Sequence, residues 1–241
     1  MLELQNISLK LPDQKEILKQ IDLQLEDKKF IVVTGPNGGG KTTLAKVISG
    51  ITWPTKGRVL LDGKDISNMG ITERAQLGIC YAFQQPVRFK GITVRDLLEL
   101  AAGRQLEEAK LCDYFIEVGL CAQDYMDREI DSSLSGGEIK RIEIATALAR
   151  NARLTIFDEP EAGIDLWSFN SLIAVFRKLQ KSGRSILIIS HQEKILEIAD
   201  EIVVIAGGKV AHHGSREAIF PLLLGEYRQT FCPKQEQEAE R

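Results

Sequence analysis

Short apolar runs recur along the chain and are separated by amphipathic stretches. Residues 2–9 and 21–25 alternate between apolar and polar positions, a pattern typical of half-exposed antiparallel strands. The run FIVVT at 30–34 is apolar throughout, as expected of a strand that is covered on both faces. Further strands are predicted at 58–66 with a turn at Asp62-Gly63, at 79–83, 154–158, 185–190 and 201–206.

Helical spacing lies between most of these strands, at 41–49, 138–150, 167–181 and 193–199. Strands that alternate with helices imply an α/β fold with a mainly parallel core sheet and helices on both sides. Between Gln84 and Leu134 the apolar residues keep helical spacing and no strand intervenes. We therefore expect one domain over 1–230, with an N-terminal antiparallel β-subdomain and a helical subdomain inserted over about 85–150. The polar residues 231–241 are expected to be a disordered tail.

Composition and charge exclude several kinds of partner. The net charge is −3 and the basic residues are scattered, so nucleic acid is not expected as a partner. No apolar stretch approaches the ~20 residues of a membrane helix, and the N-terminus does not resemble a signal peptide. We expect a cytoplasmic protein that reaches a membrane only through a partner. The cysteines lack metal-ligand spacing and are expected to be small buried side chains, at Cys80, Cys112, Cys121 and Cys232.

A glycine-rich segment joins the apolar run at 30–34 to the first helix. It fits the pattern G-x-x-x-x-G-K-[ST], in which backbone N–H groups and a helix N-terminus surround phosphate groups. Lys41 is predicted to reach the outer phosphates of a nucleoside triphosphate, and the Thr42 hydroxyl to bind Mg²⁺. The predicted nucleotide-binding residues of this segment are Gly35, Pro36, Asn37, Gly38, Gly39, Gly40, Lys41, Thr42 and Thr43.

Two acidic residues end the apolar run LTIFD. Ligands of parallel α/β sheets collect at the carboxyl ends of the strands, which is where Asp158 and Glu159 stand. Asp158 is predicted to hold Mg²⁺, and Glu159 to polarise the water that attacks the γ-phosphate. The two motifs together predict hydrolysis of a nucleoside triphosphate.

Further motifs resemble the ATP-binding-cassette (ABC) ATPases. LSGGE at 134–138 opens a helix and resembles the signature motif of that family. Gln84 in YAFQQP is similar to the Q-loop, EAGID at 161–165 to the D-loop, and His191 in IISHQ to the switch histidine. These elements occur in the family's order, and the resemblance covers essentially the whole chain.

The resemblance implies a head-to-tail dimer that encloses two ATP molecules. Ser135, Gly136 and Gly137 of one subunit would then face the γ-phosphate held by the other subunit. Asp165 would cross to the partner's site. The implied catalytic residues are Glu159, His191, Gln84 and Lys41, and the implied Mg²⁺ ligands are Thr42, Gln84 and Asp158.

One position departs from the family pattern. Family members usually carry an aromatic ring near the end of the first strand that stacks on adenine. The matching position here is Leu11, and no Tyr, Phe or Trp stands nearby. A leucine lacks the stacking geometry of a ring. Which residue reads adenine is therefore left open.

Two kinds of partner are compatible with these motifs. Three features resemble the ATPase of SUF-type iron–sulfur cluster assembly, which acts on soluble scaffold subunits: the segment AFQQPVRFKGIT, Glu138 where most transporters carry Gln, and the missing aromatic. This interpretation is favoured, although FDEPEAGID is equally typical of transporters. The alternative is the nucleotide-binding subunit of a membrane transporter. A kinase or GTPase is disfavoured, because LSGGE has no role in either and no N-K-x-D motif is present.

Overall fold

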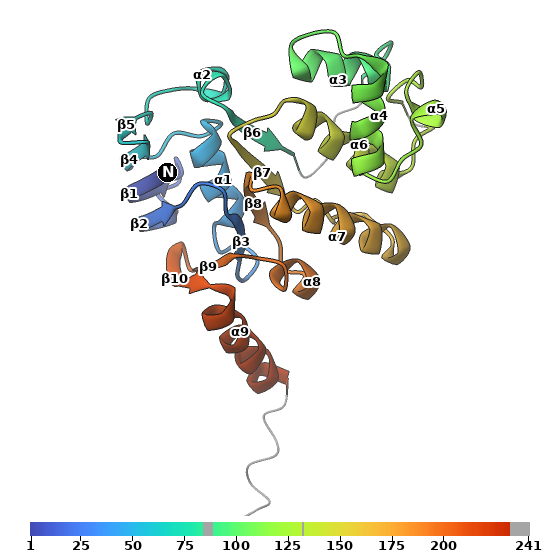
Figure 1. Ribbon diagram of the computed structural model, residues 1–241. Helices are drawn as coiled ribbons and strands as arrows, with labels where there is room; N and C mark the ends of the chain where they lie inside the picture. Colours follow the sequence, from blue (N-terminus) through green and yellow to red (C-terminus); the bar gives the residue numbers. More distant parts are fainter. Residues whose placement is uncertain (84–88, 132, 232–241) are drawn as a thin grey trace, which may run out of the picture.

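The computed structural model describes residues 1–83, 89–131 and 133–231. Two sheets and a group of helices make up this part of the chain (Figure 1). The strands are β1 Leu2–Lys10, β2 Glu16–Leu25, β3 Phe30–Thr34, β4 Lys56–Leu61, β5 Lys64–Asp65, β6 Ile79–Ala82, β7 Leu154–Asp158, β8 Ser185–Ile189, β9 Glu201–Ala206 and β10 Lys209–Ser215. The helices are α1 Lys41–Ser49, α2 Ile71–Gln76, α3 Val94–Ala102, α4 Glu108–Glu117, α5 Ala122–Tyr125, α6 Gly136–Ala149, α7 Leu166–Lys181, α8 Glu193–Leu196 and α9 Arg216–Phe231.

The larger sheet has the strand order β10-β9-β3-β8-β7-β6. Strands β9, β3, β8, β7 and β6 run parallel, and only β10 is antiparallel to its neighbour. Parallel strands end at the same edge, so the carboxyl ends of β3, β7 and β8 lie next to one another. The four-stranded sheet, β2-β1-β4-β5, is antiparallel throughout.

The two faces of the parallel sheet belong to different apolar cores. On β3, Ile31 and Val33 pack with α1 and the antiparallel sheet, whereas Phe30 and Val32 pack with the helices on the other face. Those helices include α3, α4, α6 and α7. Helix α7 is held by Phe176, whose ring contacts those of Phe30 and Phe157 edge to face. Coverage on both faces explains the uninterrupted apolar run of β3.

Helices α3 to α6 lie together on one side of the molecule, beyond β6 (Figure 1). Between β6 and α6, the described residues form only one isolated bridge, from Thr93 to Glu129, which agrees with the helical interval expected between Gln84 and Leu134. Lys140 joins this group to the sheet, because its buried ammonium donates to the Phe83 carbonyl and to Glu143. The boundary of about 85–150 for an inserted subdomain remains a proposal.

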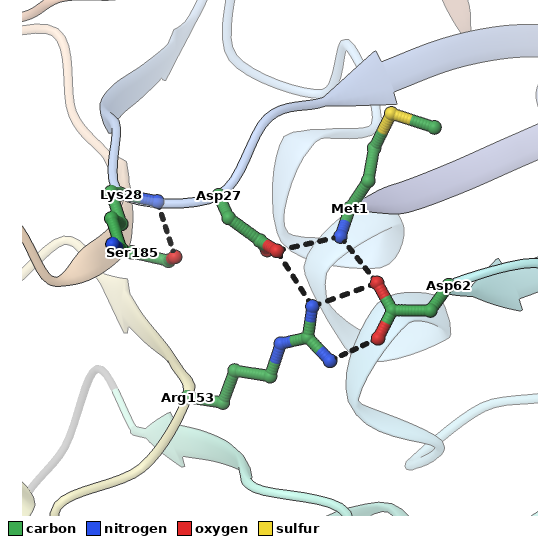
Figure 2. A network of polar contacts seen from close by, with 6 residues as sticks. All are labelled: Met1, Asp27, Lys28, Asp62, Arg153 and Ser185. Carbon is green, nitrogen blue, oxygen red and sulfur yellow. Dashed lines mark hydrogen bonds and ion pairs between the residues drawn. The ribbon is translucent and has the colours of Figure 1, made fainter.

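A charged network links the two sheets at the end opposite the carboxyl edge (Figure 2). Arg153, just before β7, donates to Asp27 and Asp62, which follow β2 and β4. The Met1 amino group donates to the same two carboxylates, at 2.9 and 2.7 Å. These groups hold the pKa of Asp62 below its usual range, chiefly through the Arg153 hydrogen bond.

Among the helices of the described residues, none combines the length and the hydrophobicity that a membrane span requires.

Candidate functional site

The glycine-rich loop follows β3 and packs against the end of β9. Gly35 has a φ of 131°, and a Cβ at this position would lie 2.1 Å from the Ile205 carbonyl oxygen. A Cβ on Gly39 would lie 2.7 Å from the same oxygen. Around Gly38, by contrast, no atom lies within 4 Å of a Cβ built on it. Glycine is therefore required where the loop touches the sheet, and the loop is open on its other side.

Two further segments support this loop, and the sequence pattern did not indicate either of them. Gly208, in the turn between β9 and β10, donates its N–H to the Gly39 carbonyl at 3.0 Å and accepts from Lys19 N at 2.8 Å. Leu18 of β2 lies against Gly40, where a Cβ would be 2.9 Å from Leu18 Cδ2. The phosphate loop is thus held from both the parallel and the antiparallel sheet.

Lys41 begins α1 and folds back over the loop. Its Nζ donates to the carbonyls of Gly35 at 2.7 Å and Pro36 at 3.0 Å. The residue is buried, so these bonds replace the water that the ammonium loses. Burial lowers the pKa of Lys41, and the charges of Glu159 and Asp158 act in the opposite direction. An ammonium group has three hydrogens, so two bonds to the loop leave one to donate to a ligand.

Thr42 and Asp158 meet as the sequence predicts. The Thr42 hydroxyl donates to Asp158 Oδ1 at 3.0 Å, and the Asp158 carboxylate is 2% exposed. The second oxygen accepts from Tyr81 Oη at 2.6 Å. Burial, reinforced by this bond, raises the pKa of Tyr81, so the phenol keeps its proton and remains a donor. Tyr81 was missed by sequence reasoning, because only the pairing of β6 with β7 places it beside Asp158.

These groups fit a magnesium–nucleotide complex. A threonine hydroxyl and a carboxylate are oxygen ligands of the kind that Mg²⁺ prefers, and Mg²⁺ usually takes its remaining ligands from phosphate and water. When bound, the ion supplies charge stabilisation to the phosphate groups.

Glu159 comes directly after β7 and leaves the strand geometry. Its φ is 47°, in the left-handed region, and its N–H donates to the Ile189 carbonyl at the end of β8. The loop that follows is also tied to β8: the Ser190 hydroxyl donates to Glu161 Oε1 at 2.5 Å. Next to Ser190 stands His191, which is exposed. The structure therefore gathers the predicted residues Glu159 and His191 at the shared edge of β7 and β8.

The signature segment forms the start of α6. Ser135 caps the helix, since its Oγ accepts from Glu138 N at 3.3 Å, and Glu138 in return accepts from Ser135 N at 2.7 Å. Glu138 also accepts from Tyr125 Oη at 2.5 Å. Within the described part of the chain, the Ser135 hydroxyl hydrogen is donated to no side chain or carbonyl, and the helix end supplies a positive partial charge.

The segment at 161–165 lies beside the signature in the same chain. A Cβ on Gly136 would be 3.4 Å from the Gly163 carbonyl oxygen, and one on Gly137 would be 3.0 Å from Ser168 Oγ. Asp165 accepts from Ser168 N at 3.0 Å at the start of α7. Gln84 lies outside the described residues.

Leu11 stands in the turn between β1 and β2. Its N–H donates to the Lys15 carbonyl at 2.9 Å, and its side chain is 40% exposed. Leu11 is therefore exposed and could contact a base, but it offers no aromatic ring to stack on adenine.

Comparison with known proteins agrees with the motifs. Residues 18–162 match the family described as ABC transporter. An uncharacterized ABC transporter ATP-binding protein of Methanocaldococcus jannaschii is 40% identical over 228 residues, covering 91% of this chain and 89% of the relative. A probable branched-chain amino acid transport ATP-binding protein of Archaeoglobus fulgidus is 34% identical, covering 90% of each chain.

Solved structures agree with the fold. A nucleotide-free ATP-binding cassette from an ABC transporter superposes with a TM-score of 0.81 at 27% identity, covering 96% of this chain and 97% of the other. An ADP-bound cassette gives 0.80 at 28% identity, covering 95% and 98%. The α/β fold expected from the sequence is confirmed, with the antiparallel β10 at one edge of the mainly parallel sheet. The chain therefore belongs to the ATP-binding-cassette family, and it is an ATPase that uses ATP and Mg²⁺.

Proposed function

We propose that this ATPase is the nucleotide-binding subunit of a membrane transporter. The observation that carries the proposal is the similarity, over about nine tenths of the chain, to proteins described as ABC transporter or amino acid transport ATP-binding proteins. The subunit would lie at the membrane surface, held there by the membrane-spanning partner.

We propose the following roles for the site residues, on the sequence motifs and the geometry together. Lys41 and the N–H groups of the loop bind the phosphates, while Thr42 and Asp158 hold Mg²⁺, together with Gln84. Glu159 accepts the proton of the attacking water, and the exposed His191 contacts the γ-phosphate. General bases of this kind contribute about 10²–10⁴-fold to a rate.

We further propose that ATP closes two subunits head to tail. Ser135 caps the N-terminus of α6, a position that favours anions, and its hydroxyl hydrogen has no acceptor among the described residues. In the dimer this site would take the γ-phosphate bound by the partner, and Asp165 would lie at the same interface.

Exposed apolar residues on the helical side support a docking site for the partner. Phe83 and Phe89, on either side of the undescribed segment 84–88, are 43% and 36% exposed, and Leu100 of α3 is 72% exposed. We propose that an apolar helix of the transporter's membrane subunit packs against them.

A soluble iron–sulfur assembly scaffold is the second candidate partner. Glu138 and the segment AFQQPVRFKGIT favour it, whereas the descriptions of the similar proteins favour transport. We therefore place transport first.

Co-purification tests the proposal directly. The tagged chain, isolated from its native cell in mild detergent, is expected to bring down a multi-span membrane protein that stimulates ATP hydrolysis. Leu100→Glu should abolish that stimulation and leave basal hydrolysis intact. The matched control is Leu222→Glu on α9, an exposed leucine at the opposite end of the molecule (Figure 1). Recovery of a soluble β-rich scaffold instead would reject transport in favour of the second candidate.

A further inference from the structure

Glu161 is a buried acidic residue beside the catalytic edge, and none of the roles above uses it. Its residue surface is 8% exposed. Oε1 accepts the Ser190 hydroxyl at 2.5 Å, while Oε2 is buried without a hydrogen-bond partner among the described residues. A buried carboxylate that is only partly satisfied costs stability, so its presence needs an explanation.

A directed chain of hydrogen bonds leads from Glu161 to both sides of His191. Ser190 Oγ accepts the N–H of Gln192 at 3.0 Å. Its single hydrogen is therefore donated to Glu161, since a hydroxyl carries only one. The Ser190 N–H is bound to the Val33 carbonyl at 3.1 Å. The backbone before His191 is thus fixed by Val33, and the backbone after it is held by the Ser190 hydroxyl, whose orientation Glu161 sets.

The pKa of Glu161 responds to Ser190, His191 and Glu159, in agreement with their positions around it. Burial raises the pKa of the Glu161 carboxyl, and the Ser190 hydrogen bond opposes the rise. A proton on the His191 ring would also lower the pKa of Glu161, and the charge of Glu159 raises it. Glu161 therefore lies within electrostatic reach of both residues to which we assign catalysis.

We propose that Glu161 is a positioning residue that holds His191 in place for hydrolysis by way of Ser190. It couples the loop after β7, which continues to Asp165, to the end of β8. A change in that loop is then passed to His191 through two hydrogen bonds. This inference rests on the proposed role of His191, and it does not depend on which partner the ATPase drives.

Kinetics provides the first test. Glu161→Leu should lower kcat by about ten- to a hundredfold, with little change in KM for ATP, because a misplaced catalytic group slows chemistry more than binding. Glu161→Gln keeps an acceptor oxygen for Ser190 and should retain most of the rate. Ser190→Ala should reproduce the loss, and adding Glu161→Leu to it should lower kcat no further. Ser49→Ala is the control, since it removes another buried hydroxyl, at the far end of α1.

Nuclear magnetic resonance provides a test that does not need activity. The chain has three histidines, so the ring signals of His191 can be assigned by comparison with His191→Ala. Ser190→Ala and Glu161→Leu should shift those signals and leave the signals of His212 and His213 on β10 in place, which also shows that the variants are folded.

Three results would overturn the inference: an unchanged kcat in Ser190→Ala, His191 signals that do not move, or a fully additive double variant. If His191→Ala keeps full turnover, the proposed role of His191 fails and the inference fails with it. If His191→Ala is inactive and the Glu161 variants are normal, only the inference fails.

Discussion

At the scale of single residues, the left-handed backbone of Glu159 separates two neighbouring acids. A non-glycine residue in this conformation costs about 1–3 kcal/mol, which the surrounding structure must supply. The bond from Glu159 N to the Ile189 carbonyl helps to hold it. Asp158 stays in the strand and binds Thr42 and Tyr81, so the turn gives the two neighbouring acids different surroundings.

Glu159→Gln tests the proposed role of Glu159 in hydrolysis. The amide keeps the size and backbone preference of the side chain but cannot accept a proton. We expect ATP binding to be preserved, turnover to fall by about 10²-fold or more, and a dimer to accumulate with MgATP. Phosphate release and size-exclusion chromatography measure the two effects. Near-normal hydrolysis would remove Glu159 from the role of general base.

Leu11 carries a second prediction, on base selectivity. An aromatic stack on a base contributes ~1–3 kcal/mol, or about five- to a hundredfold in affinity. Without one, we expect modest ATP affinity and weak discrimination between ATP and GTP. Leu11→Tyr should tighten ATP binding and leave turnover at saturating ATP nearly unchanged, as calorimetric titration can show. Tight and strongly ATP-selective binding by the unmodified protein would mean that another residue reads adenine.

At the scale of elements, one buried arginine binds the C-terminal end of α1, the helix that follows the phosphate loop. Arg74 of α2 is fully buried and donates to Val47 and Ile48 at the end of α1, and to Ser67 and Met69. The last carbonyls of a helix have no partner within it. The C-cap Gly50 N–H donates to the Val47 carbonyl at 3.3 Å, and the guanidinium adds a second donor to Val47 and one to Ile48.

Arg74→Met keeps much of the side-chain volume and removes every donor. We expect the free energy of unfolding to fall by about 2–4 kcal/mol, because buried carbonyls lose charged partners. Arg58→Met, which removes an exposed arginine on β4, should change stability by less than about 0.5 kcal/mol. Denaturant titration of both variants makes the comparison. Equal stability would mean that α1 does not need the cap.

The elements also show what the sequence could predict. Along β3 successive side chains meet the two cores in turn, whereas the buried apolar residues of β1, β2 and β4 all belong to one core. Apolar periodicity located β1 to β9, with β4 and β5 predicted as one segment, 58–66, that turns at Asp62-Gly63, but it did not locate β10. It missed α2, which is only six residues long, and α9. The motifs located Lys41, Asp158 and Glu159, but not Tyr81 or Glu161. Tyr81 and Glu161 lie near the other site residues only because β6, β7 and β8 are adjacent in the sheet. The order of strands in a sheet cannot be predicted from the apolar periodicity of each strand.

At the scale of the whole molecule, a complete ATP site would need two chains. In one chain, the signature residues contact the loop at 163 and the start of α7. Ser135→Arg should leave ATP binding to the loop intact and eliminate hydrolysis, because the bulky cation would block the partner's γ-phosphate.

Mixing Ser135→Arg with Lys41→Ala tests the head-to-tail geometry. Each mixed dimer keeps one site with intact Lys41 and Ser135, so random mixing should restore up to about a quarter of the wild-type rate. Each parent alone should stay inactive. No recovery, despite mixed dimers shown by mass spectrometry, would contradict the composite site.

The order of strands in the parallel sheet also has a consequence for synthesis on the ribosome. Strand β3 pairs with β8 and β9, which are synthesised only after β4 to β7. At a translation rate of about 5–20 residues per second, β3 (FIVVT) stays unpaired for on the order of ten seconds before β8 and β9 have been synthesised. An unpaired strand of this kind is prone to aggregate. A nascent chain stalled before β8 therefore exposes a strand that chaperones must shield, and the phosphate loop takes shape only after β8 and β9 have been made.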